Sequence, residues 1–277
     1  MTVVRDTGAA YLAVAIDHGE SFDGFLLEWK VDPAARTMVK RGIIAACLEL
    51  PPGTLQGLVV GNDLSFALPS IVEDARGAGV EVWVGLPDQV VQGSFDAART
   101  TSPTFPVCAG LWHAHACGAV GVKTGFSLAR HARWIDAGRW LEPAFEMAGE
   151  YGLQLVAEPY FSVQDTGTER ENFLEELSHH EAVRFTKLDV HEPHDWGPVY
   201  KNGKSPWLAR SEGLQFAPFR RSVTESLQYG CRGAMVGGAV WGVSGYPPLS
   251  VAYVRELQRR LKDLSDLVSQ RSPTPTR

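Results

Sequence analysis

The chain lacks the features that mark several large classes of protein. Its 277 residues carry 26 basic and 32 acidic side chains, a formal net charge of −6, so it has no basic excess of the kind that binds a phosphate backbone. No apolar run approaches the roughly 20 residues that cross a bilayer. The amino-terminal residues lack the charged-then-apolar order of a secretion signal. We therefore predict a cytoplasmic protein with no nucleic-acid or membrane partner.

Cysteine is also scarce and lacks paired spacing. The four cysteines, Cys47, Cys108, Cys117 and Cys231, lie in or beside apolar stretches. Such residues are typical of reduced, buried thiols rather than of a disulfide framework. A structural role is predicted for all four.

The glycine-rich fingerprint of a dinucleotide site is missing after the first apolar run, which favours a different kind of α/β protein. Eight short apolar runs predict strands at 11–16, 58–60, 80–85, 119–122, 153–157, 183–186, 206–209 and 233–236. Segments with helical spacing lie between or after them, including 65–79, 128–152, 169–181, 215–230 and 249–268. Strand–helix alternation with continuously apolar strands predicts a single α/β domain, a (β/α)8 barrel over residues 1–270. The polar, proline-interrupted residues 271–277 are expected to form a flexible tail.

Charged residues follow four of these predicted strands. They are Asp17, Lys123, Glu158 and Lys187, after the first, fourth, fifth and sixth strands. In a (β/α)8 barrel the carboxyl ends of the strands surround one active face, so these side chains are expected to meet there. A lysine held in such a site near a second cation can supply the neutral amine that attacks a carbonyl group. The structural alternative is an ion pair between Lys123 and Glu158 that only joins two strands.

Motifs at these positions resemble those of a known enzyme group. The chain resembles class I aldolases of the tagatose-bisphosphate and sulfofructose-phosphate aldolase group, within the wider fructose-bisphosphate and deoxyribose-phosphate aldolase superfamily. Residues 14–19 also resemble the opening of archaeal-type fructose-bisphosphate aldolases. The resemblance runs from about residue 11 to residue 242. The motifs that carry it are Gly121-Val122-Lys123, Val156-Ala157-Glu158-Pro159 and Phe185-Thr186-Lys187-Leu188-Asp189.

This resemblance implies a metal-independent lyase that cleaves or forms a ketose through a lysine Schiff base. Lys187 falls on the imine-forming lysine of the sixth strand, while Lys123, Glu158 and Asp17 fall on residues that assist it. Residues 122–124 imitate the Val-Lys-Thr segment that carries the imine lysine of deoxyribose-phosphate aldolases, so Lys123 is the alternative nucleophile. No cofactor is expected, because the iminium group takes the place of a Lewis-acidic metal. The expected partner is a small sugar, with or without a phosphate or sulfonate group, and a homo-oligomer is left open.

One position departs from the pattern of this group. After the eighth strand the group commonly has Gly-Arg-Ala-x-Trp, whose arginine holds an anion, whereas this chain has Gly238 at the arginine position. Arg210 is a candidate substitute, although Glu212, two residues after it, is a negative neighbour for an anion. Backbone amides at Ser211, Gly213, Gly237 and Gly238 are the other expected substrate contacts. The sequence does not decide whether the substrate carries an anion.

Three other functions stay open at this stage. A transaldolase would use the same imine and pass the three-carbon unit to an acceptor aldehyde. A metal-dependent lyase is suggested weakly by His113, His115 and Cys117, and by His191 and His194. A barrel that binds a sugar without catalysis is the third alternative.

Overall fold

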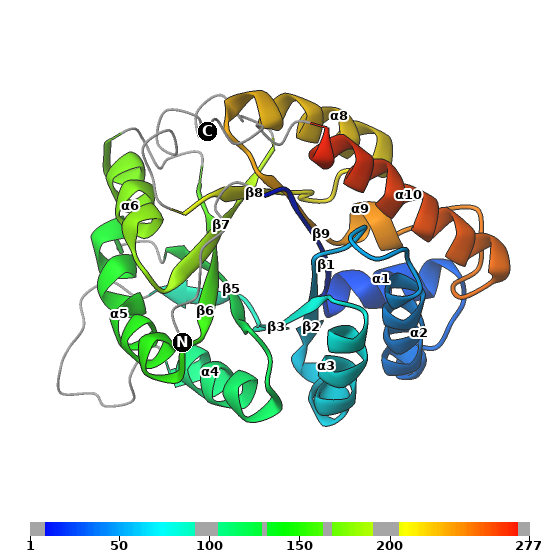
Figure 1. The fold of residues 1–277 in the computed structure, drawn as a ribbon, viewed down its shortest axis with the longest axis horizontal. Coiled ribbons are helices and arrows are strands. Elements are labelled where there is room, and N and C mark those ends of the chain that lie inside the picture. The colour runs from blue at the N-terminus through cyan, green and yellow to red at the C-terminus, as the bar shows by residue number, and fades with distance from the viewer. Residues whose placement is uncertain (1–8, 92–104, 129–131, 163–167, 191–204, 271–277) are drawn as a thin grey trace.

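Eight parallel strands close into a barrel in the computed structural model, which describes residues 9–91, 105–128, 132–162, 168–190 and 205–270 (Figure 1). The predicted tail at 271–277 lies outside the described residues. The barrel strands are β1 (Tyr11–Ile16), β2 (Gly57–Gly61), β3 (Glu81–Gly85), β5 (Gly121–Leu128), β6 (Gln154–Tyr160), β7 (Val183–Asp189), β8 (Trp207–Arg210) and β9 (Gly233–Val236). The pairing of β3 with β5 closes the ring, with Trp83 opposite Gly121. The (β/α)8 barrel predicted from the sequence is confirmed.

Helices surround the barrel, as Figure 1 shows. They are α1 (Glu20–Glu28), α2 (Arg36–Leu48), α3 (Leu68–Gly77), α4 (Phe105–Cys117), α5 (Trp134–Tyr151), α6 (Thr168–His179), α8 (Phe216–Ser226), α9 (Gly238–Trp241) and α10 (Val251–Ser269). Short 3-10 helices, η1 (Pro33–Ala35), η2 (Asn62–Ala67) and η3 (Leu227–Tyr229), join some of these elements. Among the described residues, no helix has the length and apolarity required to pass through a bilayer.

Three strands are longer than their apolar runs. β5 was expected to end at 122 but continues to Leu128, because its second half pairs with β6 and with the short strand β4 (Gln89–Val91). β6 and β7 likewise extend to Tyr160 and Asp189. The predicted helix over 128–152 consequently begins at Trp134. Lys123, Glu158 and Lys187 therefore lie within strands rather than after them.

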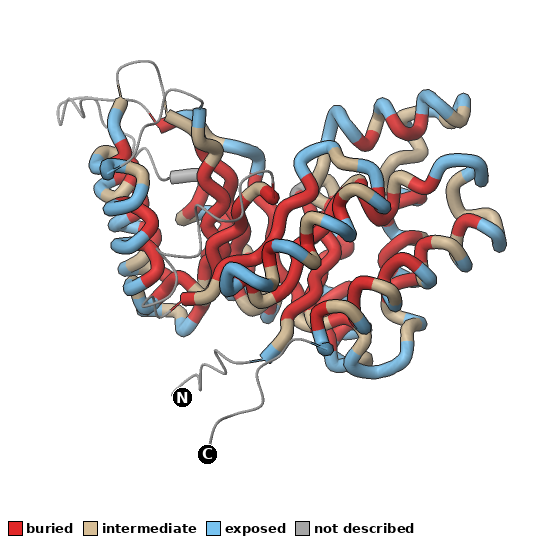
Figure 2. Tube along the Cα trace, turned by 90° about the horizontal axis from the view of Figure 1, so that it is seen from above, coloured by how far each residue is buried: buried red, intermediate tan, exposed pale blue. Residues whose placement is uncertain are grey.

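Two apolar layers hold the barrel together. One fills its interior and includes Ala15, Trp83, Val156 and Phe185, and the other lies between the strands and the helices. Figure 2 shows the buried trace at the centre and the exposed residues on the outer turns of the helices. In α10, Leu257, Leu261 and Leu264 are fully buried against this core, so their apolar spacing serves the barrel itself, whereas Leu267 is only partly buried.

The cysteines differ in burial. Cys47 and Cys231 are buried as predicted, and burial raises the pKa of each thiol to about 12. Cys108 and Cys117, in contrast, are only partly buried on α4. The prediction of four buried thiols is therefore wrong for these two, which pack against the edge of the core and stay partly accessible.

Arg184 and its partners occupy the amino-terminal end of the barrel. Its guanidinium group donates to both carboxylate oxygens of Glu81, at 2.7 and 2.8 Å. It also lies 5.3 Å from the ring centre of Tyr11 and 5.1 Å from that of Phe185, within the range of cation–π attraction. Side chains fill this end of the barrel, and the cavity lined by Glu158 and Lys187 lies toward the carboxyl ends of the strands.

Candidate active site

Four predicted site residues form a continuous set of ion pairs inside the carboxyl-terminal half of the barrel. The Nζ atom of Lys123 lies 3.1 Å from Oδ2 of Asp17 and 2.5 Å from Oε2 of Glu158. The other oxygen of Glu158 lies 2.8 Å from Nζ of Lys187. No more than 6% of any of these side chains is exposed. The structure thus brings Asp17, Lys123, Glu158 and Lys187 together, as the strand positions predicted.

The two-residue period of the strands explains why these side chains point inward. Val156 and Phe185 fill the barrel interior, and Glu158 and Lys187 follow them by two residues on the same strands. Ala15 and Leu208 belong to the same interior layer. Asp17 and Arg210, two residues after these, complete a polar layer above the apolar one.

The two lysines have opposite pKa shifts. Burial lowers the pKa of Lys187, the carboxylate of Glu158 raises it and the charge of Lys123 lowers it, with a net lowering. Burial acts in the same way on Lys123, but Asp17 and Glu158 together raise its pKa well above the ordinary value. Lys123 therefore holds its proton more firmly than an ordinary lysine, and Lys187 gives up its proton more readily.

The carboxylates are anions in this environment. Burial raises the pKa of Glu158, but Lys123, Lys187 and Arg210 outweigh burial and lower it to about 2. For Asp17, burial is likewise outweighed by Lys123, His18 and Lys187, so its pKa also falls below the ordinary value. Two anions therefore alternate with Lys123 and Lys187 across the barrel.

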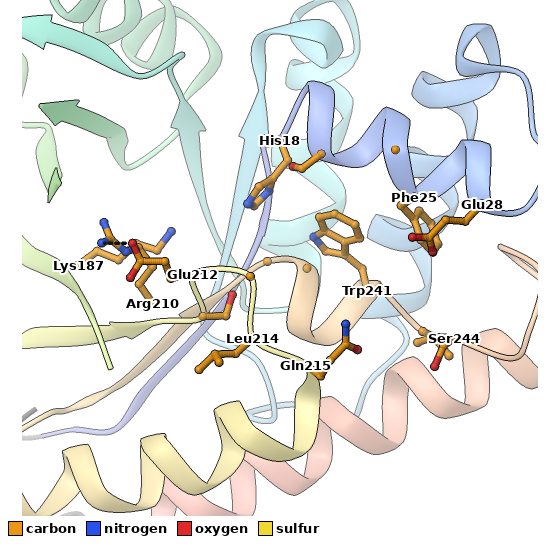
Figure 3. A pocket seen from close by; sticks show the side chains of 18 of the residues that line it. His18, Phe25, Glu28, Lys187, Arg210, Glu212, Leu214, Gln215, Trp241 and Ser244 are labelled. Carbon is orange, nitrogen blue, oxygen red and sulfur yellow. Dashed lines mark hydrogen bonds and ion pairs between the residues drawn. The ribbon is translucent and has the colours of Figure 1, made fainter. Parts of the chain in front are cut away.

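A cavity of about 460 Å³ opens onto this set of ion pairs. Lys187 and Glu158 line it, whereas Lys123 and Asp17 do not. Figure 3 shows Lys187 and Arg210 at one end, His18 and Trp241 in the middle, and Phe25, Glu28 and Ser244 toward the other end. A molecule in the cavity would thus meet the amine of Lys187 rather than that of Lys123.

All five predicted substrate-binding residues line the same cavity: Arg210, Ser211, Gly213, Gly237 and Gly238. Arg210, however, is surrounded by anions. Its guanidinium nitrogens lie 3.2 Å from Glu212, 3.6 Å from Asp189 and 3.8 Å from Glu158. Its guanidinium carbon also lies 4.4 Å from the ring centre of Tyr160. Several carboxylates therefore already compensate the charge of Arg210.

His18 is a site residue that the sequence reasoning missed. Its Nδ1 atom lies 3.4 Å from Asp17, and its ring packs edge-on against Trp241 at 5.4 Å between centres. A Cβ atom at Gly237 would overlap this ring, so glycine is required there for the ring to occupy its place. Burial lowers the pKa of His18 more than Asp17 raises it, which favours the neutral imidazole. No local pattern distinguishes His18, because the residues that hold its ring, Gly237 and Trp241, lie more than 200 residues away at α9.

Tyr160 and Trp241 also form walls of the cavity. Tyr160 follows Glu158 by two residues on β6, so the alternation of side chains along a strand could have predicted that both face the same side. The indole nitrogen of Trp241 donates to the carbonyl oxygen of Ala15 at 3.0 Å, and the hydroxyl of Tyr253 donates to the carbonyl oxygen of Trp241 at 2.7 Å. These bonds join the end of β1 to α9 and α10.

Lys40 supports the loop that carries Asp17 and His18. Its side chain is fully buried, and its ammonium group donates to the carbonyl oxygen of His18 and to Asp63, each at 2.7 Å. No sequence motif distinguishes this lysine, which lies on α2 outside the barrel.

The histidines that suggested a metal are not gathered in the described part of the chain. There, no group of three or more His, Cys, Asp or Glu side chains is arranged to hold a metal ion. On α4, Cys117 lies 3.8 Å from His113, and His115 stacks on Tyr151 at 4.7 Å. His191 and His194 lie outside the described residues.

Comparisons with known proteins relate the fold to aldolases. No protein-family model matches the sequence, and no curated protein matches it. An archaeal fructose-1,6-bisphosphate aldolase, solved with its catalytic lysine bound to the carbinolamine intermediate, superposes with a TM-score of 0.59 at 16% identity, over 96% of each chain. The fold is that of these aldolases. A structure of a Schiff-base-forming fructose-1,6-bisphosphate aldolase gives 0.55 at 16% identity over 94% of each chain. The YdjI aldolase of Escherichia coli K12 gives 0.52 at 12% identity, over 98% of this chain and 94% of the other.

Proposed function

We propose that this chain is a class I aldolase that cleaves or forms a ketose through an imine on Lys187, giving a three-carbon ketone and an aldehyde. The observation that carries the proposal is that Lys187 is a buried lysine with a lowered pKa that lines the cavity beside Glu158. A buried amine whose neutral form is favoured is the nucleophile that imine formation requires. The aldolase fold supports the same chemistry by analogy.

The reaction begins when the neutral amine of Lys187 attacks the ketone carbon and forms a carbinolamine. The carbinolamine hydroxyl takes up a proton from solvent and leaves as water, which gives a protonated imine. The bond between the carbon next to the imine carbon and the following, hydroxyl-bearing carbon then breaks. Its electron pair forms the double bond of a neutral enamine, and the hydroxyl-bearing fragment gives up its hydroxyl proton to the base and leaves as an aldehyde. Protonation of the enamine and addition of water release the ketone and restore Lys187.

Glu158 is the proposed base for the hydroxyl proton in the cleavage step, directly or through a water that it orients. Its contact with Lys187, at 2.8 Å, places it next to the imine nitrogen. The imine loses its positive charge as the enamine forms, so the cations that lower the pKa of Glu158 become fewer in that step. The basicity of Glu158 consequently increases when the proton must be taken.

Lys123 and Asp17 are proposed to support these two residues from behind the cavity. The charge of Lys123 lowers the pKa of Lys187, and Asp17 holds Lys123 at 3.1 Å. Lys123 would also orient Glu158 through the contact with its second oxygen. In this arrangement Asp17 acts through Lys123 rather than on the substrate.

Trapping with borohydride tests the proposal. Ketoses with and without phosphate are incubated with the chain and sodium borohydride, and peptides are mapped by mass spectrometry. We expect a reduced adduct on Lys187, no adduct in Lys187→Met, and retention of the Lys187 adduct in Lys123→Met. An adduct on Lys123, or full turnover by Lys187→Met, would refute the assignment.

Turnover that a chelator abolishes would favour a metal-dependent lyase, and sugar binding without adduct or turnover would favour a non-catalytic barrel. Addition of acceptor aldehydes distinguishes a transaldolase.

A further inference from the structure

The two ends of the cavity have different chemistry. Lys187 and Glu158 form the reacting end, and Figure 3 places Phe25, Glu28 and Ser244 well away from Lys187, beyond Trp241. A ketose joined to Lys187 through its carbonyl carbon would extend toward these residues. The far end of the cavity therefore contacts the part of the substrate that does not react.

Side chains at the far end are uncharged or acidic. Ser244 provides a hydroxyl group and Glu28 a carboxylate there, and Gln215 provides an amide group nearer the middle of the cavity (Figure 3). Phe25 packs edge-on to Trp241, at 5.6 Å between ring centres, and both line the cavity. Hydroxyls, amides and a carboxylate exchange hydrogen bonds with sugar hydroxyl groups, and aromatic rings pack against the carbon chain of a sugar. A phosphate or sulfonate group would instead meet the negative charge of Glu28.

Both cationic side chains of the described cavity lining, a lysine and an arginine, already have a role or a partner. Lys187 and Arg210 are the only lysine and arginine among the described residues that line the cavity. Lys187 is the nucleophile in the proposed reaction. Arg210 lies within 4 Å of Glu212, Asp189 and Glu158, so an anionic ligand would have to compete with these carboxylates for it.

We propose that the substrate is a ketose whose non-reacting end carries free hydroxyl groups, without phosphate or sulfonate. This inference rests on the proposed aldolase function for the reacting end of the site. The specificity comes chiefly from the carboxylates that compensate the buried Arg210. The exposed carboxylate of Glu28 adds a weaker repulsion of an anion and accepts hydroxyl donors. Backbone amides of Gly237 and Gly238 would then donate to uncharged sugar oxygens.

Binding to the Lys187→Met variant tests the substrate class without depending on the reaction. Affinities of that variant for unphosphorylated ketohexoses and for their phosphate esters are measured by calorimetry. We expect the free ketoses to bind at least about tenfold more tightly than the esters, because like charges oppose the esters. Equal affinities, or tighter binding of the esters, would overturn the inference.

Gly238 offers a second, independent test. A Cβ atom built at this position meets only ring carbons of Trp241, at 3.7 and 3.8 Å, so a side chain can extend from it into the cavity. We expect Gly238→Arg to strengthen binding of phosphate esters by about tenfold, since it adds a cation to the cavity lining. Gly238→Gln, of similar reach but uncharged, should not do so. If the wild-type chain already binds the esters best and Gly238→Arg adds nothing, the proposal is wrong.

The two tests keep this inference separate from the proposed function. Preferential binding of free ketoses to Lys187→Met, without a borohydride adduct on the wild-type chain, would support the substrate class and refute the imine. An adduct on Lys187 that forms most readily with phosphate esters would support the imine and refute the substrate class.

Discussion

The carboxylate of Glu158 contacts Lys187 through one oxygen, at 2.8 Å, while its other oxygen lies 2.5 Å from Lys123. One buried carboxylate is thus shared between two lysines whose pKa values are shifted in opposite directions. Glu158 holds Lys123, whose pKa is raised, next to Asp17, and it also contacts Lys187, whose pKa is lowered. Most of the following predictions test this shared contact.

Substitution of Glu158 by glutamine should separate imine formation from cleavage. The variant keeps the size of the side chain but lacks the charge that raises the pKa of Lys187, so the neutral amine becomes more abundant. We expect borohydride trapping to persist while turnover falls by about 10²- to 10⁴-fold, the usual contribution of a positioned base. The matched control is Glu142→Gln, at an exposed position of α5 outside the cavity. Loss of trapping in parallel with turnover would contradict the assigned role.

Replacement of Lys123 by methionine should change the pH dependence of the reaction. The charge of Lys123 lowers the pKa of Lys187, so its removal raises that pKa and leaves less neutral amine at pH 7. The acid side of the pH–rate profile should move to higher pH, with a rate loss of about tenfold at pH 7 for each pH unit moved. Lys262→Met, at an exposed position of α10, should leave the profile in place. A profile that stays in place in Lys123→Met would contradict the proposed electrostatic role.

The free energy of unfolding should fall in acid through the same carboxylates. The folded-state pKa of Glu158 is about 2, below its ordinary value of 4.5, so its ionised form stabilises the folded chain above about pH 4.5. This stabilisation, at most about 3 kcal/mol, should be lost as the pH falls from about 4.5 to 2, and Asp17 adds to it in the same direction. Urea unfolding across this range measures the loss. Glu158→Gln should show a shallower pH dependence, and an unchanged slope would refute this account.

Lys40→Met should weaken both the fold and the site. The substitution removes the two 2.7 Å hydrogen bonds of a fully buried ammonium group and leaves the carbonyl oxygen of His18 without that donor. We expect a loss of about 2 to 3 kcal/mol in the free energy of unfolding. Because the loop of Asp17 and His18 would shift, KM should rise more than kcat falls. Arg41→Met, an exposed neighbour on α2, is the control, and an unfolding free energy like that of the wild type would refute the role of Lys40.

The order of strands and helices could be predicted because it depends on local patterns. Continuous apolar runs such as 11–16 and 233–236 coincide with β1 and β9, since a strand covered on both faces needs apolar residues throughout. The extent of β5 could not be predicted in this way. Lys123, Thr124 and Gly125 interrupt its apolar run, and the residues beyond them are ordered by pairing with β4 and β6, which are distant in the sequence.

The sequence by itself determined that Asp17, Lys123, Glu158 and Lys187 meet at one end of a barrel, because parallel strands place their carboxyl ends together. Only the tertiary structure decided that Lys187 faces the cavity while Lys123 lies behind it. It also decided that carboxylates compensate Arg210 and that the ring of His18 lies over Gly237. These relationships join residues far apart in the chain, so they depend on closure of the sheet. Lys123 and Lys187 are the same residue type, so their distances to the neighbouring carboxylates and their access to the cavity distinguish their roles.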